Sequence, residues 1–458
     1  MVKNKPIILP GLPALFFRNP LLIILILAYS CSPSKKMAKT IPSTVPAADT
    51  LNAEIIALPD KKNALTKTDP FLEDLLKQYP QYFDSILVNR NALRVQIIYT
   101  QIDRGANNIP HFRNYYFNVN QDQYFYPAST VKLPIAALAL QKIHESGIAA
   151  LDRKATMITE SACSEQTAVY QDPTARDGRP SLEQYIKKIF LVSDNDAFNR
   201  LYEFLGQEYI NDQLHKMGYS EAQILHRLEL TMTGDENRHT NPVQFRDSGN
   251  RIIYDQAAQY NEASFPGRND FLGAGFYRND SLIGGPMDFS SKNRIGLESL
   301  HNILRSILFP RSVGAEQRFN ISSEDYQFLN QYMSEWPRES NSPSYDSSYY
   351  DAYCKFILLG SDKRIPPPAN IRIFNKVGDA YGFLLDIAYV SDFANNVEFM
   401  LSAVIYCNRD GIINDDRYDY EELGYPFMKR LGQVIYDFEL KRNRKHPPDL
   451  SEFQMKYN

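Results

Sequence analysis

Apolar side chains recur along the chain with two different periods, and the change between them separates predicted strands from predicted helices. Residues 91–99 alternate apolar and polar positions, which predicts a strand buried on one face. Residues 181–190 repeat apolar side chains every three or four positions behind a serine cap, which predicts a helix. The same criteria predict strands at 115–119, 371–378, 383–390 and 397–407, and helices at 69–76, 198–205 and 425–438.

An apolar stretch with a polar first turn begins at Ser129 and predicts a buried helix. Ser129 and Lys132 stand three positions apart, so a helix places both side chains on one face. Burial beside apolar neighbours lowers the pKa of a lysine, and a neutral lysine can activate a hydroxyl as a nucleophile. Ser129 and Lys132 are therefore candidate catalytic residues.

Two further polar segments interrupt apolar elements and could face the same site. Ser193, Asp194 and Asn195 fall between two predicted helices, where the short polar side chains of a tight turn can point into a cleft. Lys376 lies on the first strand of a predicted hairpin whose connection is 379–382.

The composition limits the possible partners and cofactors. With 458 residues, of which 43% are hydrophobic and 23% charged, the chain has the balance of a globular protein. A net charge of −4 without a long basic run argues against nucleic acid as a partner. The cysteines follow no metal-ligand spacing and suggest no disulfide framework, so we expect neither a metal nor another cofactor. They are Cys31, Cys163, Cys354 and Cys407.

The first 31 residues resemble a bacterial lipoprotein signal. Lys3, Lys5 and Arg18 precede a short apolar run, Leu21 to Ala28, which is far below the roughly 20 residues of a membrane-spanning helix. Cys31 ends this region and would become the lipidated first residue, although a plain secretory signal cut nearby is the alternative. Either signal would export the protein, and lipidation would anchor it in the bacterial cell envelope, facing the periplasm.

The rest of the chain divides into three parts. Residues 32–66 are rich in Pro, Ser, Thr, Ala and Lys without a period, which predicts a flexible tether. Residues 67–440 would form one elaborated domain, followed by a C-terminal tail at 441–458. We expect the protein to be a monomer.

The three polar segments resemble the motifs of penicillin-recognising serine hydrolases, and within them the class A β-lactamases. That family carries S-x-x-K, S-D-N and K-T-G in this chain order. The corresponding segments are Ser129–Lys132, Ser193–Asn195 and Lys376–Gly378. The resemblance spans about residues 67–440 and implies an α+β fold, in which a five-stranded antiparallel sheet is flanked by helices and a helical subdomain carries the nucleophile.

A fourth segment is similar to the start of the class A Ω-loop, where an Arg-x-Glu supplies the base for deacylation. Arg227 and Glu229 stand in those places, with Arg227 as the structural companion of the glutamate. The resemblance implies that Ser129 attacks a carbonyl carbon, with Lys132 as the base or Glu229 acting through a water. Glu229 and a water would then hydrolyse the acyl-enzyme.

The remaining motif residues would hold the substrate. By resemblance, Ser193 would pass a proton to the leaving nitrogen, and Asn195 would bind the amide side chain of the substrate. Lys376 would attract the substrate carboxylate. The backbone N–H of the nucleophile and that of Asp379, which follows Gly378, would form the oxyanion hole.

The chain departs from the family pattern in several places. Val377 replaces a hydroxyl residue that would bind the substrate carboxylate. Asp379 puts an acid beside the developing oxyanion, where its charge is unfavourable unless it points away. Thr233 stands where the family uses Asn to hold the hydrolytic water. Extra residues near 241–292 and 339–353 could cover the cleft and exclude bulky antibiotics.

Three functions are compatible with these motifs. The first is hydrolysis of a β-lactam or related amide by a serine hydrolase resembling class A β-lactamases. The second is a D-Ala-D-Ala peptidase that acts on cell-wall peptides and shares the serines and lysines, whereas fast deacylation of a β-lactam should require Glu229. The third is a catalytically weak envelope protein that binds wall peptides, which only Val377 and Asp379 support.

Overall fold

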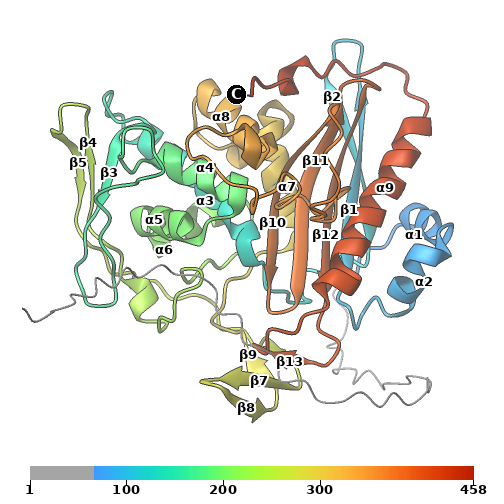
Figure 1. The fold of residues 1–458 in the computed structure, drawn as a ribbon, viewed down its shortest axis with the longest axis horizontal. Coiled ribbons are helices and arrows are strands. Elements are labelled where there is room, and N and C mark those ends of the chain that lie inside the picture. Colours follow the sequence, from blue (N-terminus) through green and yellow to red (C-terminus); the bar gives the residue numbers. More distant parts are fainter. Residues whose placement is uncertain (1–65, 458) are drawn as a thin grey trace, which may run out of the picture. The chain divides into compact units, whose positions relative to one another are not determined.

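In a computed structural model, residues 66–457 are described, and they form a central antiparallel sheet with helices on both faces (Figure 1). The predicted signal with Cys31 and almost all of the predicted tether lie outside the described residues.

The sheet has five strands in the order β10-β11-β12-β1-β2, and every neighbouring pair is antiparallel. The strands are β1 (Gln96–Arg104), β2 (Pro110–Phe117), β10 (Ile371–Ala380), β11 (Phe383–Asp392) and β12 (Val397–Tyr406). The predicted α+β class with a five-stranded antiparallel sheet is therefore confirmed. The hairpin between β10 and β11 turns on Tyr381 and Gly382, whose φ angles of 53° and 82° are left-handed.

The prediction for the first strand is wrong in both its limits and its exposure. Residues 91–94 form turns, and β1 begins only at Gln96. Ile97 and Ile98 point to opposite faces of the sheet, and both are fully buried. Helices cover both faces, and a strand buried on both faces has no regular alternation of apolar and polar side chains.

One face of the sheet is covered by helices from both ends of the described chain. This layer consists of α1 (Pro70–Lys77), α2 (Pro80–Val88) and α9 (Tyr425–Lys441). The three helices lie to the right of the strands in Figure 1. Leu72, Phe83 and Ile435 are fully buried in the hydrophobic cluster that these helices share with the sheet.

The residues after α9, which were predicted to form a tail, pack against the body. The ring of Phe453 is 1% exposed and contacts the rings of Phe309, Phe374 and Tyr389. Tyr457 then stacks on Arg372, with 3.7 Å between the guanidinium carbon and the ring centroid. This segment therefore completes the hydrophobic core on the second face of the sheet.

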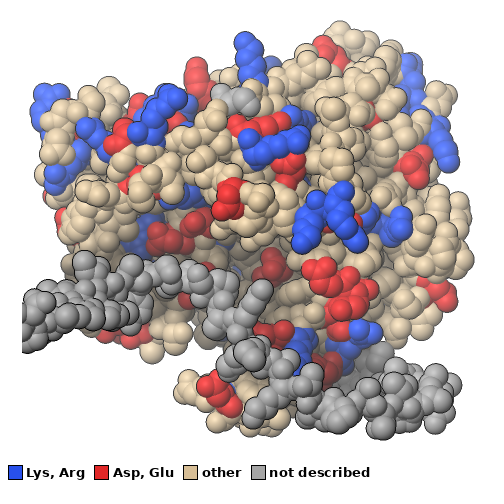
Figure 2. All heavy atoms as spheres, viewed as in Figure 1, with Lys and Arg blue, Asp and Glu red and all other residues tan. Residues whose placement is uncertain are grey.

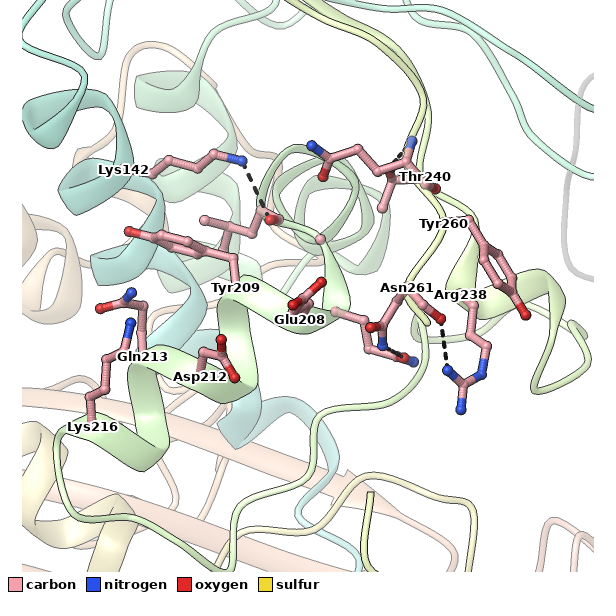
Figure 3. Close-up of a pocket in the computed structure, with 14 residues that line it drawn as sticks. Lys142, Glu208, Tyr209, Asp212, Gln213, Lys216, Arg238, Thr240, Tyr260 and Asn261 are labelled. Carbon is pink, nitrogen blue, oxygen red and sulfur yellow. Dashed lines mark hydrogen bonds between the residues drawn. The ribbon is translucent and has the colours of Figure 1, made fainter. Parts of the chain in front are cut away.

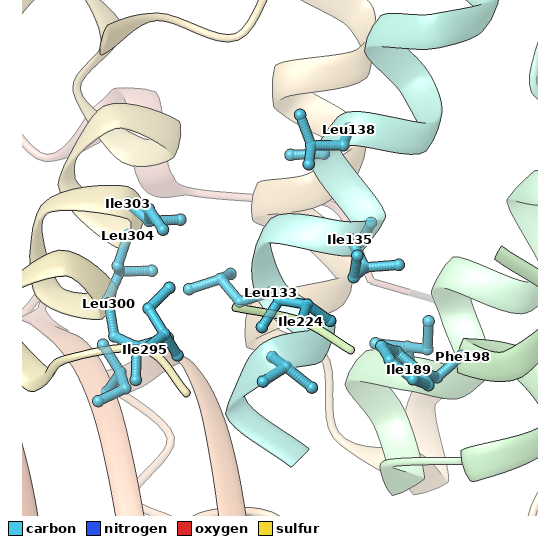
Figure 4. Close-up of a cluster of buried hydrophobic side chains, with 14 of the residues drawn as sticks. Leu133, Ile135, Leu138, Ile189, Phe198, Ile224, Ile295, Leu300, Ile303 and Leu304 are labelled. Atoms are coloured by element: carbon cyan, nitrogen blue, oxygen red, sulfur yellow. The ribbon is translucent and has the colours of Figure 1, made fainter. Parts of the chain in front are cut away.

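The second face of the sheet carries a helical subdomain. Its helices are α3 (Lys132–Glu145), α4 (Leu182–Val192), α5 (Asn195–Leu205), α6 (Gln207–Lys216), α7 (Leu297–Leu308) and α8 (Ser323–Ser334). Leu133, Ile135 and Leu138 of α3 are fully buried among apolar side chains of α4, α5 and α7 (Figure 4). The predicted buried helix is confirmed, and Ser129 lies in the short 3-10 turn Ala128–Val131 that precedes it.

Short strands occupy the segment near 241–292 that was predicted as an insertion. They are β4 (Val243–Arg246), β5 (Ile252–Gln256), β6 (Phe271–Leu272), β7 (Gly275–Arg278), β8 (Ser281–Gly284) and β9 (Met287–Asp288). β4 pairs with β5 and with β3 (Thr156–Thr159), whereas β7 pairs with β8 and with β13 (Ile412–Ile413). Strands this short give no usable alternation, so the sequence did not predict them.

Surface charge, membrane spans, thiols and possible metal ligands are considered next for the described residues. Acidic and basic side chains are mixed in small groups over the face drawn in Figure 2. None of the helices between residues 66 and 457 has the length and apolar character required to cross a bilayer. In the same part of the chain the thiols of Cys163, Cys354 and Cys407 are free, and no group of three or more His, Cys, Asp or Glu is placed to hold a metal ion.

Candidate active site

The turn between α4 and α5 presents Ser193 and Asn195. Ser193 ends α4 with a left-handed φ of 61°. The Asp194 carboxylate accepts a hydrogen bond from the backbone N–H of Ala197 at 2.7 Å and so caps α5. The two helices are therefore joined by one tight turn, as predicted, with Asn195 as the first residue of α5.

Lys132 meets this turn from the start of α3. Its side chain is fully buried, and its Nζ donates to the backbone carbonyl of Ser193 and, at 2.5 Å, to Oδ1 of Asn195. The Ser193 Oγ lies 3.3 Å from the same Nζ. The structure thus brings together three of the predicted site residues, which come from two motifs.

The surroundings of Lys132 favour its neutral form. Burial lowers its pKa well below the usual value, and the positive charge of Lys376 lowers it further, while Asp194 and Asp379 act in the opposite direction. A neutral amine has two N–H groups and one lone pair. Because two carbonyl-type oxygens accept the two N–H groups, the lone pair remains available for the proton of a serine hydroxyl.

Lys376 reaches the same place from the sheet. Its Nζ donates to Ser193 Oγ at 2.8 Å and to the backbone carbonyl of Val377 at 2.9 Å. Burial lowers the pKa of Lys376 to about 8. The Ser193 hydroxyl therefore lies between the amines of Lys376 and Lys132, one from β10 and one from α3.

The side chain of Val377 points away from Lys132, Ser193 and Lys376. Alternate residues of a strand face opposite sides, and Val377 is 2% exposed within the hydrophobic cluster beneath α9. Val377, which replaces the hydroxyl residue of the family pattern, is therefore a core residue.

Buried polar contacts hold β10 in place on the face opposite Lys376. The Lys355 Nζ donates to Oδ1 of Asn375 at 2.5 Å, and the Asn375 Nδ2 donates to Asp386 of β11 at 2.8 Å. Burial lowers the pKa of Lys355 and raises that of Asp386. Lys355 lies in a segment without regular secondary structure, so no local pattern predicted its place beneath the sheet.

The turn that carries Ser129 lies directly against Gly378. A Cβ atom added at Gly378 would stand 2.9 Å from the carbonyl oxygen of Pro127 and 3.0 Å from the backbone nitrogens of Ser129 and Thr130. Only glycine permits this approach, which brings the backbone next to Asp379 close to the Ser129 N–H. The two N–H groups predicted for the oxyanion hole are therefore neighbours.

Ser129 itself is accessible. Its side chain is partly exposed, and no hydrogen bond joins its hydroxyl to another side chain of residues 66–457. The preceding residue, Ala128, has a left-handed φ of 47°. Such conformations are costly for residues other than glycine and are found preferentially at functional sites.

Residues 224–229 are held by polar side chains spaced four apart along α5 and α6. These are Asn195, Asn199, Glu203, Gln207 and Asn211. Asn195 Nδ2 donates to the Glu229 carboxylate at 2.7 Å, and Asn199 bonds both backbone groups of Leu228. A polar stripe at this spacing is visible in the sequence and could have indicated that a loop covers it.

Arg227 is paired with a glutamate of α5. Arg227 does not contact Glu229; its Nε donates to Glu203 at 3.0 Å, and both side chains are buried. Arg200 pairs with the same carboxylate at 2.9 Å. Arg227 thus supports Glu229 only indirectly, by fastening the loop to α5.

Glu229 is exposed and adopts a left-handed φ of 61°. Because Asn195 accepts from Lys132 and donates to Glu229, one asparagine connects the predicted acylation and deacylation bases. Thr233, which stands where the resembled family uses Asn to hold the hydrolytic water, forms a local hydrogen bond. Its hydroxyl accepts from the backbone N–H of Glu236 at 3.2 Å, which caps a short turn.

The first predicted insertion packs next to the Ser129 turn, and the second contacts the helical subdomain. Phe289 packs its ring against Tyr381 at 5.1 Å and Tyr126 at 6.2 Å, next to the Ser129 turn. In the second segment, Ser342 Oγ accepts from the backbone N–H of Arg176 at 3.1 Å and so ties residues 339–353 to the helical subdomain.

A cavity of about 670 Å³ lies elsewhere, along α6 (Figure 3). It is lined by polar side chains that include Lys142, Tyr209 and Arg238. None of the residues predicted for the site lines it.

One family model matches part of the chain. Residues 81–261 match the Beta-lactamase enzyme family. The chain is similar to a β-lactamase from Chitinophaga pinensis DSM 2588, with 11% identity and a TM-score of 0.44 over 81% of this chain and 99% of the other. A class A β-lactamase from Clostridium kluyveri DSM 555 gives 14% identity and a TM-score of 0.43, over 78% and 98% of the two chains.

A PBP-A variant solved as an acyl-enzyme complex with penicillin G shows 15% identity and a TM-score of 0.42, over 82% and 98% of the chains. No curated protein sequence matches significantly. TM-scores this low add nothing to the case for a function. The match over residues 81–261 confirms the predicted resemblance to β-lactamases at the level of this family.

Proposed function

We propose that the protein is a serine hydrolase that cleaves an amide or a β-lactam ring through an acyl-enzyme on Ser129. The main support is the position of Ser193 Oγ between Lys132 and Lys376, next to the Ser129 turn. A hydroxyl between two amines with lowered pKa values can relay a proton in either direction at neutral pH.

In the acylation step, the Ser129 Oγ forms a bond to the carbonyl carbon and its proton moves to Lys132. The N–H groups of Ser129 and Asp379 stabilise the oxyanion. When the bond to the leaving nitrogen breaks, that nitrogen takes a proton through Ser193. This sequence of transfers uses the lone pair of Lys132 that the two carbonyl-type oxygens leave free.

In the deacylation step, Glu229 removes a proton from a water that attacks the acyl carbon. Ser129 recovers its proton, and the acyl group leaves as a carboxylic acid. Glu229 suits this role because it is exposed and its carboxylate accepts a hydrogen bond from Asn195. A pure peptidase would not require a glutamate fastened beside its lysine, so we favour the hydrolase over the peptidase.

We also propose that the mature protein is exported and anchored to the bacterial envelope through Cys31. The support is the order of Lys3, Lys5, the apolar run and Cys31 in the sequence. Labelling of cells with a radioactive fatty acid would reveal a labelled protein, and Cys31→Ser should remove the label. Retention of the label by this variant would contradict the assignment.

The enzymatic proposal is tested by nitrocefin hydrolysis with the purified protein and its Ser129→Ala variant. Turnover that disappears in the variant would support β-lactamase chemistry. A stable adduct on Ser129 without turnover would favour the peptidase. Failure of nitrocefin and of a fluorescent penicillin to react would remove both and favour a binding role.

A further inference from the structure

The ring of Tyr126, three residues before Ser129, lies where several segments of the proposed site meet. It is 4% exposed and meets the ring of Tyr381 edge to face, with 4.9 Å between the centroids. It also stacks on the ring of His226, at 6.1 Å and with 7° between the planes. Tyr381 belongs to the turn between β10 and β11, and His226 precedes Glu229 by three residues. The chain that leads into Ser129 therefore contacts both the main hairpin and the segment that carries Glu229.

The imidazole of His226 is neutral and held in one orientation. Its Nδ1 lies 2.5 Å from the backbone carbonyl oxygen of Arg227, which can only accept, so Nδ1 carries the hydrogen. The backbone N–H and carbonyl of His226 both bond the side-chain amide of Asn293, at 3.1 and 3.2 Å. Burial, reinforced by the charge of Lys292, lowers the pKa of His226 to about 4. The ring is therefore uncharged at neutral pH.

The stack on Tyr126 joins residues 224–229 to a different element than their other contacts do. Hydrogen bonds from α5 fix the backbone of Leu228 and the carboxylate of Glu229 relative to the helices. The stack fixes the same segment relative to the chain that leads into Ser129. Deacylation depends on this second relation, because the water activated by the carboxylate must reach the acyl carbon. A misplacement of about 1 Å can lower a rate about 100-fold.

We propose that His226 is a positioning residue for deacylation, and that its stack on Tyr126 holds the Glu229 carboxylate within reach of the acyl group. This inference rests on the proposed acyl transfer by Ser129. Acylation does not depend on the stack in the same way, because Lys132 takes the serine proton in that step. The contribution of the imidazole is the aromatic contact and not a proton transfer, since its hydrogen is bound to a backbone carbonyl.

Two substitutions separate the stack from the hydrogen bond. His226→Phe keeps an aromatic ring against Tyr126 and removes the donor to Arg227. His226→Asn removes the ring and keeps a side-chain donor near the place of Nδ1. His239→Asn is the matched control, because His239 also packs its ring against a tyrosine, Tyr260 at 4.6 Å, but is exposed.

The two steps are measured on the same samples with a fluorescent penicillin. The rate of labelling reports acylation, and the loss of label after removal of the excess reagent reports deacylation. Only molecules that fold well enough to be labelled enter the second measurement, so a loss of stability does not imitate slow release.

We expect His226→Asn to slow release about tenfold, because loss of the stack allows a shift of about half an ångström, and to leave labelling within about threefold. His226→Phe should release its label within about threefold of the unmodified protein. Its release should also keep the same pH dependence around neutrality, because the ring is replaced without loss of a titrating group there. If His226→Asn does not fold, His226→Leu fills the space without a ring and replaces it.

Normal labelling and normal release in His226→Asn would overturn the inference and leave the proposed function intact. Slow release in His226→Phe would also overturn it, because that variant keeps the stack. An equal slowing of labelling and release, or slow release in the His239→Asn control, would count against a specific role in deacylation. If the unmodified protein were not labelled on Ser129, or never released its label, the proposed function would fail, and the inference with it.

Discussion

Replacing Gly378 by alanine tests the contact that places Ser129 against the sheet. The added Cβ would stand 2.9 Å from the Pro127 carbonyl oxygen and 3.0 Å from the nitrogens of Ser129 and Thr130. All three atoms belong to the backbone, so no flexible side chain can move to relieve the contact. Either β10 or the Ser129 turn must shift.

The size of that shift sets the expected effect. The contacts are roughly half an ångström shorter than the optimal separation of about 3.5 Å. Overpacking of this kind costs about 1–3 kcal/mol of stability. A misplacement of about 1 Å can lower a rate about 100-fold, so a shift of half that size predicts a loss of about tenfold in the acylation rate.

The rate of labelling by a fluorescent penicillin measures acylation, and a thermal melt measures stability in the same samples. Gly284→Ala serves as the control, because its added Cβ meets no atom within 4 Å. A Gly378→Ala variant that folds normally and labels as fast as the unmodified protein would refute this account of the site.

Three further predictions concern Lys376 and the loop that carries Glu229. Arg227→Ala leaves a buried carboxylate with one partner fewer and should lower the free energy of unfolding by about 3–5 kcal/mol in urea titration; a loss below about 1 kcal/mol would show that the pair does not fasten the loop. Asn199→Leu removes both bonds to Leu228 and should slow deacylation more than acylation, so that the acyl-enzyme accumulates. With nitrocefin, which carries a carboxylate, kcat/KM should fall above about pH 8 as Lys376 loses its proton, and Lys376→Arg should move this decline to higher pH; an unchanged pH profile would contradict the role of the amine.

The sequence was sufficient to find the residues that meet at the site, because each motif depends on local structure. Ser129 and Lys132 share a helix start, and Ser193 and Asn195 flank a capped turn, so their spacing already fixes their relative positions. The strand around Lys376 was equally clear. What the resemblance added was the order of these segments and the expectation that they converge.

Other features depend on contacts that local patterns do not encode. β1 was misjudged because helices bury both of its faces, which removes the alternation that would have marked its limits. No local pattern indicated that Arg227 would pair with Glu203, which lies on another element.

The most direct test of the central claim is to trap the acyl-enzyme and locate it. The Glu229→Gln variant, which should acylate but not deacylate, is incubated with nitrocefin or with penicillin and analysed by intact-protein and peptide mass spectrometry. We predict one acyl group per chain, carried on Ser129 and absent when Ser129→Ala is added. Absence of an adduct with either reagent, or an adduct on a different residue, would contradict the account.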